Sequence, residues 1–389
     1  MPSRVLTGLD AFCADVPADL RGARVGLLTC PTAIDHNFRH AVELIGSLDS
    51  LSLVALFGPE HGIRGEAQAG DHVASANDTR KGLPVHSLYG ASRIPSAEML
   101  AGLDAMIVDM KDIAVRYATY ASTTFHVIDA AEEHGIEVVI LDRPNPLNGV
   151  AVQGNLLDPA FRSFVGGHSI PIRHGLTLGE LATLYAREQG QRAPRVVAMK
   201  GWRRSMWQDE TGLPWVLPSP NLPTLDAVTL YPATCLLEGT NLSEGRGTTK
   251  PFEFVGAPWI DPDTLAATLN GLDIAGVGFR PIFFVPTFSK HTSERCGGVQ
   301  IHITDRKALN GPALGVQLLA TLRTHAPDRF SWIAPNDDAR PYFIDLLAGS
   351  GRLRQAIDAE ERPASLVAAW QAEAMSFSER HQSVALYRD

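Results

Sequence analysis

The fold of this chain is best predicted from two adjoining stretches, the apolar run Leu53-Val54-Ala55-Leu56-Phe57 and the loop Gly58-Pro59-Glu60-His61-Gly62-Ile63-Arg64-Gly65-Glu66. The first has the length and composition of a buried strand, and Pro59 cannot donate the next ladder hydrogen bond. The glycines allow the backbone to bend and a ligand to approach closely. Ionisable side chains on a loop that follows a buried strand are a common place for chemistry in α/β proteins.

Similar apolar runs recur on both sides of this strand and alternate with helical patterns. Continuous apolar strands separated by helices indicate a parallel sheet that is covered on both faces. The chain is therefore predicted to be an α/β protein with a Rossmann-like, doubly wound parallel sheet. Further strands are expected at 24–30, 83–88, 105–110 and 137–141, and helices at 38–48 and 123–134.

The pattern changes after this region. Thr177 is expected to cap a helix that reaches residue 189, with Glu180 completing a capping box. Residues 215–259 are dense in Pro, Gly, Asn and Thr, show little periodicity, and are expected to form a long functional loop. A smaller C-terminal α/β domain should follow, so the predicted domains are 1–230 and 231–389, the second including the polar loop 231–259. This domain is expected to contain a helix at 261–269 and strands at 278–288 and 299–304. A further strand is expected at 195–200, before the loop and within the first domain.

Composition excludes several classes of protein. The 389 residues are 45% hydrophobic with a net charge of −9, which argues against a nucleic-acid partner. No apolar stretch is long enough for a transmembrane helix, and the first residues lack a signal-peptide core. A cytoplasmic protein is expected, or a periplasmic one if a leader has been removed; the oligomeric state is left open. The widely spaced cysteines are expected to be reduced thiols, namely Cys13, Cys30, Cys235 and Cys296.

Three predicted strands end in or just before an acidic residue. Glu60, Asp109 and Asp142 should therefore meet at one edge of the sheet, and they are the candidate catalytic carboxylates. The alternative is that these acids cap helices or form ion pairs. The basic residues available for such pairs are Lys111, Arg116 and Arg143.

His61 is expected to be a polar active-site residue that orients or tunes Glu60. Together with Asp71 and His72 these two residues could instead bind a metal ion, but the spacing matches no common metal motif and H-E-x-x-H is absent. No cofactor is expected, since G-x-G-x-x-G does not follow the first strand and the P-loop pattern is not met. The absence of G-x-S-x-G also argues against a serine hydrolase of the α/β type.

Arginines in glycine- or proline-rich loops suit the binding of a carboxylate or phosphate, although a salt bridge that stiffens the loop is the alternative. The middle loop mixes amides, hydroxyls and carboxylates with aromatic residues such as Trp215 and Tyr231. Sugars need this mixture, because rings pack on aromatic faces and hydroxyls need polar partners. The candidate substrate-binding residues are Arg64, Arg143, Asn145, Asn221, Glu238, Asn241, Glu244 and Arg246.

Four strings resemble those of one bacterial family, the exo-β-N-acetylmuramidases of peptidoglycan turnover, which was formerly of unknown function. The resemblance runs in order along nearly the whole chain. It implies a Rossmann-like N-terminal domain, a smaller C-terminal domain and an active-site cleft between them. It also implies that Glu60 is the essential glutamate. The strings are 58–62 (GPEHG), 141–146 (LDRPNP), 218–223 (PSPNLP) and 238–247 (EGTNLSEGRG).

The expected activity is therefore that of an exo-acting glycosidase that releases N-acetylmuramic acid from the non-reducing end of peptidoglycan fragments. Glycoside cleavage needs a proton donor and a second group. Glu60 is expected to be the general acid/base. The lactyl carboxylate of the sugar should require a cationic subsite, for which Arg143 and Arg246 are predicted, with Arg64 behind them. A non-catalytic muropeptide- or sugar-binding protein and a metal-dependent hydrolase are the alternatives. The second group is Asp109, Asp142, Glu238, Glu244 or the acetamido group of the substrate.

Overall fold

The computed structural model describes residues 4–65, 67, 68, 70, 71, 76–78, 82–337 and 340–389. Its N-terminal part is built on a sheet with the strand order β3-β4-β2-β1-β5-β6-β9. Six of these strands are parallel, and β3 pairs antiparallel with β4 at one edge. The strands are β1 (Arg24–Thr29), β2 (Ser52–Gly58), β3 (Ala76–Asn77), β4 (Pro84–Ser87), β5 (Ala105–Asp109), β6 (Glu137–Leu141) and β9 (Arg195–Val197).

The strand order reverses at β1. The chain moves from β1 to β2 and β4 on one side, and then returns to β5, β6 and β9 on the other. In open α/β sheets, ligands bind at this reversal, outside the carboxyl ends of the strands. The loops that follow β1, β2 and β5 are therefore the ones that the topology brings to a binding site.

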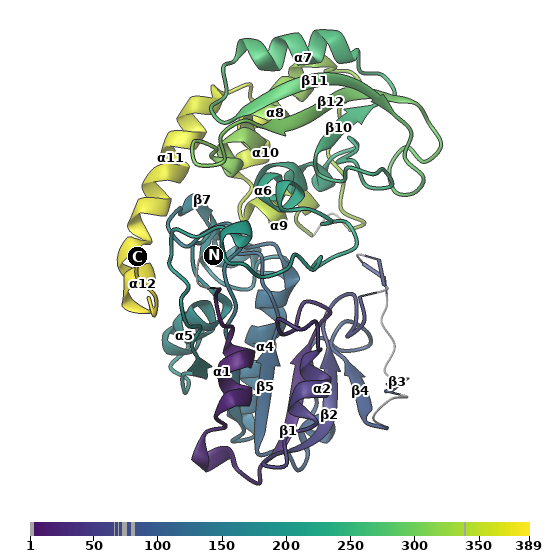
Figure 1. Ribbon diagram of the computed structural model, residues 1–389. Helices are drawn as coiled ribbons and strands as arrows, with labels where there is room; N and C mark the ends of the chain where they lie inside the picture. The colour runs from purple at the N-terminus through teal and green to yellow at the C-terminus, as the bar shows by residue number, and fades with distance from the viewer. Residues whose placement is uncertain (1–3, 66, 69, 72–75, 79–81, 338–339) are drawn as a thin grey trace.

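Strand β5 shows why both faces of the sheet are covered. Ala105 and Ile107 pack into one hydrophobic cluster, and Met106 and Val108 into another, as the two-residue period of a strand requires. Helices cover both clusters, so the predicted doubly wound α/β layer is confirmed (Figure 1). The first cluster contains α1 (Gly8–Ala14) and α2 (Ala41–Ile45), and the second contains α4 (Thr119–Glu133) and α5 (Leu178–Glu188).

The C-terminal part is smaller and has an antiparallel sheet in the order β10-β12-β11, with helices packed against it. Its longest helix, α8, has 15 residues. No helix in the described part of the chain is long and apolar enough to cross a membrane. The elements are α6 (Leu225–Thr234), η4 (Cys235–Gly239), β10 (Phe254–Ala257), α7 (Pro262–Gly271), β11 (Val277–Phe284), β12 (Cys296–Ile303), α8 (Gly311–His325), α9 (Phe343–Ala348), α10 (Arg352–Asp358), α11 (Pro363–Ser376) and α12 (Ser378–Ser383).

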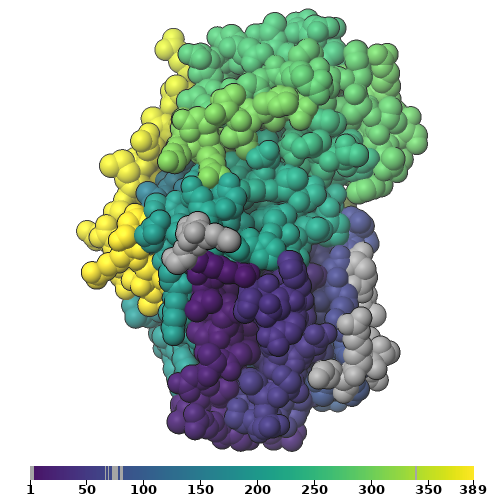
Figure 2. Space-filling view, in the orientation of Figure 1, coloured from purple at the N-terminus to yellow at the C-terminus, as the bar shows by residue number. Residues whose placement is uncertain are grey.

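The end of the chain returns to the N-terminal part. Helices α11 and α12, yellow in Figure 1, run down one side of the molecule, and α11 packs on β7 while α12 contacts α5. The space-filling view shows the green C-terminal part seated on the purple and blue N-terminal part (Figure 2). The remaining short elements are β7 (Gln153–Leu156) with its antiparallel partner β8 (Pro171–Arg173), α3 (Ala97–Leu100), η1 (Ala18–Leu20), η2 (Pro159–Phe161) and η3 (Gln208–Glu210).

The expectation of a structureless segment at 215–259 was wrong. The segment contains α6, η4 and β10. Helix α6 has no apolar stripe because it is buried on nearly every side, with Val228, Leu230 and Ala233 all in the core. It also carries Pro232 in its interior, a residue that predicts a break rather than a helix.

Helix ends also differed from the predictions. The helix expected at 38–48 is limited to α2, because His40 caps it and Phe38 has a φ of 62°. The helix expected at 123–134 begins earlier, at Thr119. The capping box of Thr177 and Glu180 is confirmed. The reading of the four cysteines as free thiols is confirmed too.

Candidate active site

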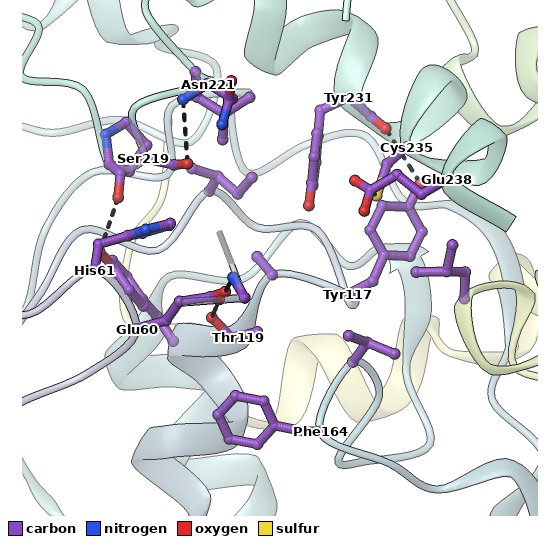
Figure 3. Close-up of a pocket in the computed structure, with 18 of the residues that line it drawn as sticks. Glu60, His61, Tyr117, Thr119, Phe164, Ser219, Asn221, Tyr231, Cys235 and Glu238 are labelled. Carbon is purple, nitrogen blue, oxygen red and sulfur yellow. Dashed lines mark hydrogen bonds between the residues drawn. The ribbon is translucent and has the colours of Figure 1, made fainter. Parts of the chain in front are cut away.

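A pocket of about 650 Å³ lies where the carboxyl edge of the parallel sheet meets the C-terminal part. One wall comes from the loops after β2 and β5 and from the start of α4. The other comes from residues 218–222, α6, η4 and the loops at 244–252 and 288–290. Figure 3 shows Glu60, His61 and Thr119 on one side of this pocket and Cys235 and Glu238 on the other.

Glu60 stands two residues after the end of β2 and is mostly buried. Its Oε2 accepts a hydrogen bond from the hydroxyl of Thr119 at 2.6 Å, and its Oε1 accepts one from the backbone N–H of Gly70 at 3.0 Å. Thr119 is the first residue of α4, so the carboxyl group is fixed between a strand end and a helix start. No cation lies within ion-pair distance of Glu60 among the described residues.

His61 adopts a left-handed backbone conformation with φ 72°, and its ring lines the same wall. Its Nδ1 lies 2.8 Å from the carbonyl oxygen of Ala67. A carbonyl oxygen can only accept, so Nδ1 carries a proton, and in the neutral ring Nε2 is left as a hydrogen-bond acceptor. The hydrogen bond from His61 to Ala67 thus joins two parts of the loop that carries Glu60.

Tyr89, Arg93 and Phe164 extend the wall beside Glu60. The guanidinium of Arg93 stacks 4.2 Å from the ring centroid of Phe164 and 5.2 Å from that of Tyr89. Burial, together with the negative charge of Glu60, raises the pKa of Tyr89 to about 12. This phenol therefore stays protonated at neutral pH and can donate a hydrogen bond.

The opposite wall carries a balanced group of charges. Arg246 donates from Nη2 to Glu238 at 2.9 Å and lies 3.2 Å from Glu244 through Nε. Lys290 donates to the second oxygen of Glu244 at 2.9 Å and to two backbone carbonyls. Both cations of this wall are thus neutralised by its two carboxylates.

Aromatic rings also line the pocket, and Figure 3 shows Tyr117 and Tyr231 on the same side as Glu238. The rings of Tyr117 and Tyr231 lie 5.5 Å apart, and those of Tyr231 and Phe252 lie 4.8 Å apart at an angle of 83°. The hydroxyl of Tyr117 donates to the carbonyl of Pro232, and its buried ring packs against that of Tyr231. Ring faces next to carboxylates, hydroxyls and amides suit a sugar.

Six of the twelve predicted site residues line the pocket: Glu60, His61, Asn221, Glu238, Glu244 and Arg246. Asn221 donates through Nδ2 to the side chain of Gln68 at 3.2 Å, which links the loop of residues 218–223 to the loop after β2. The other six residues do not line it: Arg64, Asp109, Asp142, Arg143, Asn145 and Asn241.

Asp109 and Arg143 form a buried ion pair with each other. Arg143 donates to both carboxylate oxygens, at 2.5 and 2.9 Å, and to the carbonyl of Ile34. This is the ion-pair alternative for Asp109, and it also removes Arg143 from the expected cationic subsite. The pair instead joins the ends of neighbouring strands β5 and β6.

Asp142 follows β6, and its side chain points to the start of α5 rather than into the pocket. It accepts hydrogen bonds from Thr177, from the backbone N–H of Gly179 and, at 2.6 Å, from the hydroxyl of Tyr387. Burial nevertheless raises the pKa of Asp142 to about 6. This acid therefore fits the helix-capping alternative, and it also fastens the C-terminal end of the chain to the sheet.

The remaining three residues are engaged in local contacts. Arg64 pairs with Asp78 at 2.6 Å. Asn145 donates to the carbonyl of Leu176 and accepts from the backbone of Leu147. Asn241 donates to the carbonyl of Arg329 and accepts from the backbone N–H of Ser331. Arg64 thus forms the salt bridge that was the alternative for it, and the two asparagines satisfy backbone groups of nearby loops.

Sequence reasoning missed four charged residues that line the pocket, namely Arg93, Lys111, Asp112 and Lys290. Lys111 and Asp112 follow the end of β5 by two and three residues, much as Glu60 follows the end of β2 by two. From the sequence, Lys111 was expected only to be an ion-pair partner for the acids. The position of Lys111 and Asp112 in the sequence could have identified them. They follow β5, which lies next to β1, the strand at which the sheet order reverses and where ligands usually bind.

The metal-binding alternative receives no support from the described residues. None of their His, Cys, Asp and Glu side chains form a group of three or more that could hold a metal ion. Of the four residues considered for it, Glu60 and His61 line the pocket and Asp71 does not. His72 lies outside the described residues.

The model of the N-terminal domain of the exo-β-N-acetylmuramidase NamZ matches residues 25–226, and that of the C-terminal domain matches residues 229–387. The chain belongs to the NamZ family. Glu60 and the charged group around Arg246 thus fall in different domains of the NamZ model, and the pocket lies between them.

Relatives match over nearly the whole chain. The peptidoglycan β-N-acetylmuramidase NamZ of Bacillus subtilis is 42% identical over 385 residues, which is 99% of this chain and 92% of that protein. Two crystal structures of DUF1343 family proteins from Bacteroides fragilis share the fold. One has a TM-score of 0.90 at 34% identity and covers 99% of both chains; the other has a TM-score of 0.79 at 30% identity and covers 100% of both.

Proposed function

We propose that this protein is an exo-acting glycoside hydrolase that releases N-acetylmuramic acid from the non-reducing end of peptidoglycan fragments. Family membership and the B. subtilis relative support the substrate class. The single observation that carries the assignment is Glu60, an acid held at a strand end in a pocket with aromatic faces and hydrogen-bonding groups.

Glu60 is the proposed general acid/base. Of the four carboxylates that line the described pocket, Glu238 and Glu244 pair with Arg246, and Asp112 lies 3.7 Å from His174. Glu60 has the hydroxyl of Thr119 as a partner instead. A hydroxyl donates to the carboxylate form and accepts from the acid form. The contact can therefore persist while the proton leaves for the glycosidic oxygen and returns.

Glu238 is the proposed second group. Both oxygens of Glu244 are bound by cations, whereas Glu238 uses one oxygen for Arg246 and Cys235 and keeps the other without a hydrogen bond to the described residues. Asp112 also has an oxygen without a partner, but that atom is closed off by its neighbours. Glu238 remains 20% exposed and can reach a ligand or a water molecule.

The test is release of chromophore from an aryl β-N-acetylmuramide, beside the matching N-acetylglucosaminide, with and without chelator. We expect chelator-insensitive turnover of the muramide, and its loss in Glu60→Gln. Glu132→Gln, an exposed glutamate near the end of α4, is the matched control and should keep full turnover. Absence of turnover with either glycoside would favour a sugar-binding protein, and loss of turnover with chelator would favour a metal-dependent hydrolase.

A further inference from the structure

Lys111 is a buried cation with no counter-ion among the described residues. It is 97% buried as a residue, since its relative exposure is 3%, and it lines the pocket. Its Nζ makes no hydrogen bond or ion pair with any described residue and lies over the ring of Trp215, 5.4 Å from the ring centroid. A buried ammonium group without an anion is energetically unfavourable. Burial lowers the pKa of Lys111 to about 7, and the positive charge of Arg143 acts in the same direction.

The groups around Lys111 do not neutralise it. Arg143, after β6, is bound to Asp109, and Cys30, after β1, is a thiol whose pKa is raised by burial. Asp112, the next residue in the chain, accepts from the backbone of Ala114 through the oxygen that faces His174. No carboxylate of the described residues lies within ion-pair distance of Lys111.

The other cations of the described pocket are already engaged. Arg246 and Lys290 are neutralised by Glu238 and Glu244. Arg93 is exposed and stacks on aromatic rings at the edge of the pocket. Lys111 is therefore the cation in this lining that combines burial with an unfilled need for an anion.

We propose that Lys111 binds the carboxylate of the lactyl ether of the muramyl residue and so selects N-acetylmuramic acid over N-acetylglucosamine. The inference rests on the proposed function, in which the substrate carries one carboxylate that its competitor lacks. Lys111 then replaces Arg143, Arg246 and Arg64, the residues for which the sequence predicted this role. A glucosaminyl ligand would leave the ammonium group buried and unpaired, which disfavours it.

The test compares kcat/KM for the aryl muramide and the aryl glucosaminide in Lys111→Met, which keeps most of the length of the side chain and removes its charge. We expect a loss of roughly 30-fold or more for the muramide, as for truncation of one partner of a buried charge pair. The value for the glucosaminide should stay within about threefold or rise, because the variant removes the unpaired ammonium group that disfavours this ligand. Lys111→Arg should recover part of the muramide value. The matched control is Lys307→Met, an exposed lysine outside the pocket.

Equal losses on the two glycosides, or no loss on the muramide, would overturn the role of Lys111. Thermal unfolding of each variant shows whether a lost activity reflects misfolding or lost recognition. If Lys111→Met does not fold, the same comparison of kcat/KM on the two glycosides is made with Lys111→Gln and Lys111→Arg. If the wild-type protein hydrolyses neither glycoside, the proposed function fails, and calorimetry with free N-acetylmuramic acid still tests the inference. Tighter binding of this acid than of N-acetylglucosamine, lost in Lys111→Met, would support it; equal binding of both sugars would overturn it.

Discussion

The hydroxyl of Thr119 lies 2.6 Å from Oε2 of Glu60 and joins the loop after β2 to the first residue of α4. The two residues are 59 positions apart in the chain. The contact holds the proposed acid/base in place. It can persist in both protonation states of Glu60, because the hydroxyl donates to the carboxylate and accepts from the acid.

Removal of this hydroxyl should therefore lower turnover. We expect Thr119→Val to reduce kcat by about 10- to 100-fold, the equivalent of a lost hydrogen bond to a charged group. Thr119→Ser should keep most of the activity. Thr268→Val removes a helix hydroxyl in α7, away from the pocket, and serves as the control. Unchanged kcat in Thr119→Val would show that Glu60 is positioned by other contacts.

Glu238→Ala should lower kcat by at least about 100-fold, since a positioned acid or base contributes roughly that much or more. Azide should restore turnover in this variant, because a small anion can fill the space and attack the anomeric carbon. The product would then be a glycosyl azide, identified by mass spectrometry. Near-normal turnover without azide would instead assign the second role to the acetamido group of the substrate.

Arg246→Ala should reduce activity on the muramide and the glucosaminide to a similar degree. The reason is that Arg246 neutralises Glu238 and Glu244, so its removal leaves carboxylates uncompensated rather than removing a contact to the lactyl group. The free energy of unfolding should fall by about 3 kcal/mol. Arg246→Lys should recover part of it. A loss confined to the muramide would return Arg246 to the cationic subsite that the sequence predicted.

The preference for the muramide should weaken as the pH rises above about 7. Burial lowers the pKa of Lys111 to about 7, so the unliganded site loses the proton that an anionic ligand needs as the pH rises through this value. Binding of a carboxylate should favour the charged form and cause proton uptake. The ratio of kcat/KM for the two glycosides, followed from pH 6 to 9, checks this. A flat ratio in the wild-type protein, equal to that of Lys111→Met, would contradict it.

Tyr387→Phe should lower stability without changing kcat. Tyr387 donates to Asp142, and neither residue lines the pocket. Burial raises the pKa of Asp142 from 3.8 to about 6, so the folded state binds this proton more tightly than the unfolded state and loses stability as the pH rises from about 4 to 6. Loss of the Tyr387 donor should raise this pKa further. The stability gap between variant and wild type, measured by denaturant unfolding, should therefore grow above pH 6 to about 1–3 kcal/mol.

The family strings and the apolar strands were sufficient to predict the fold class and to select Glu60, which lines the pocket. Local patterns carried this information, since buried parallel strands are continuous apolar runs and a loop rich in glycine marks where they end. Helix α6 escaped detection because its burial on nearly every side removes the periodicity on which the prediction depends.

The sequence by itself determined the layered α/β fold, the strand ends that carry acids, and the family. Only the tertiary structure decided which charged groups reach the pocket. Asp109 meets Arg143, Asp142 meets the start of α5, and Lys111 meets no anion in the part of the chain that the structure describes. These outcomes depend on partners that lie far along the chain, and a buried charge is defined by the neighbours that neutralise it or fail to do so.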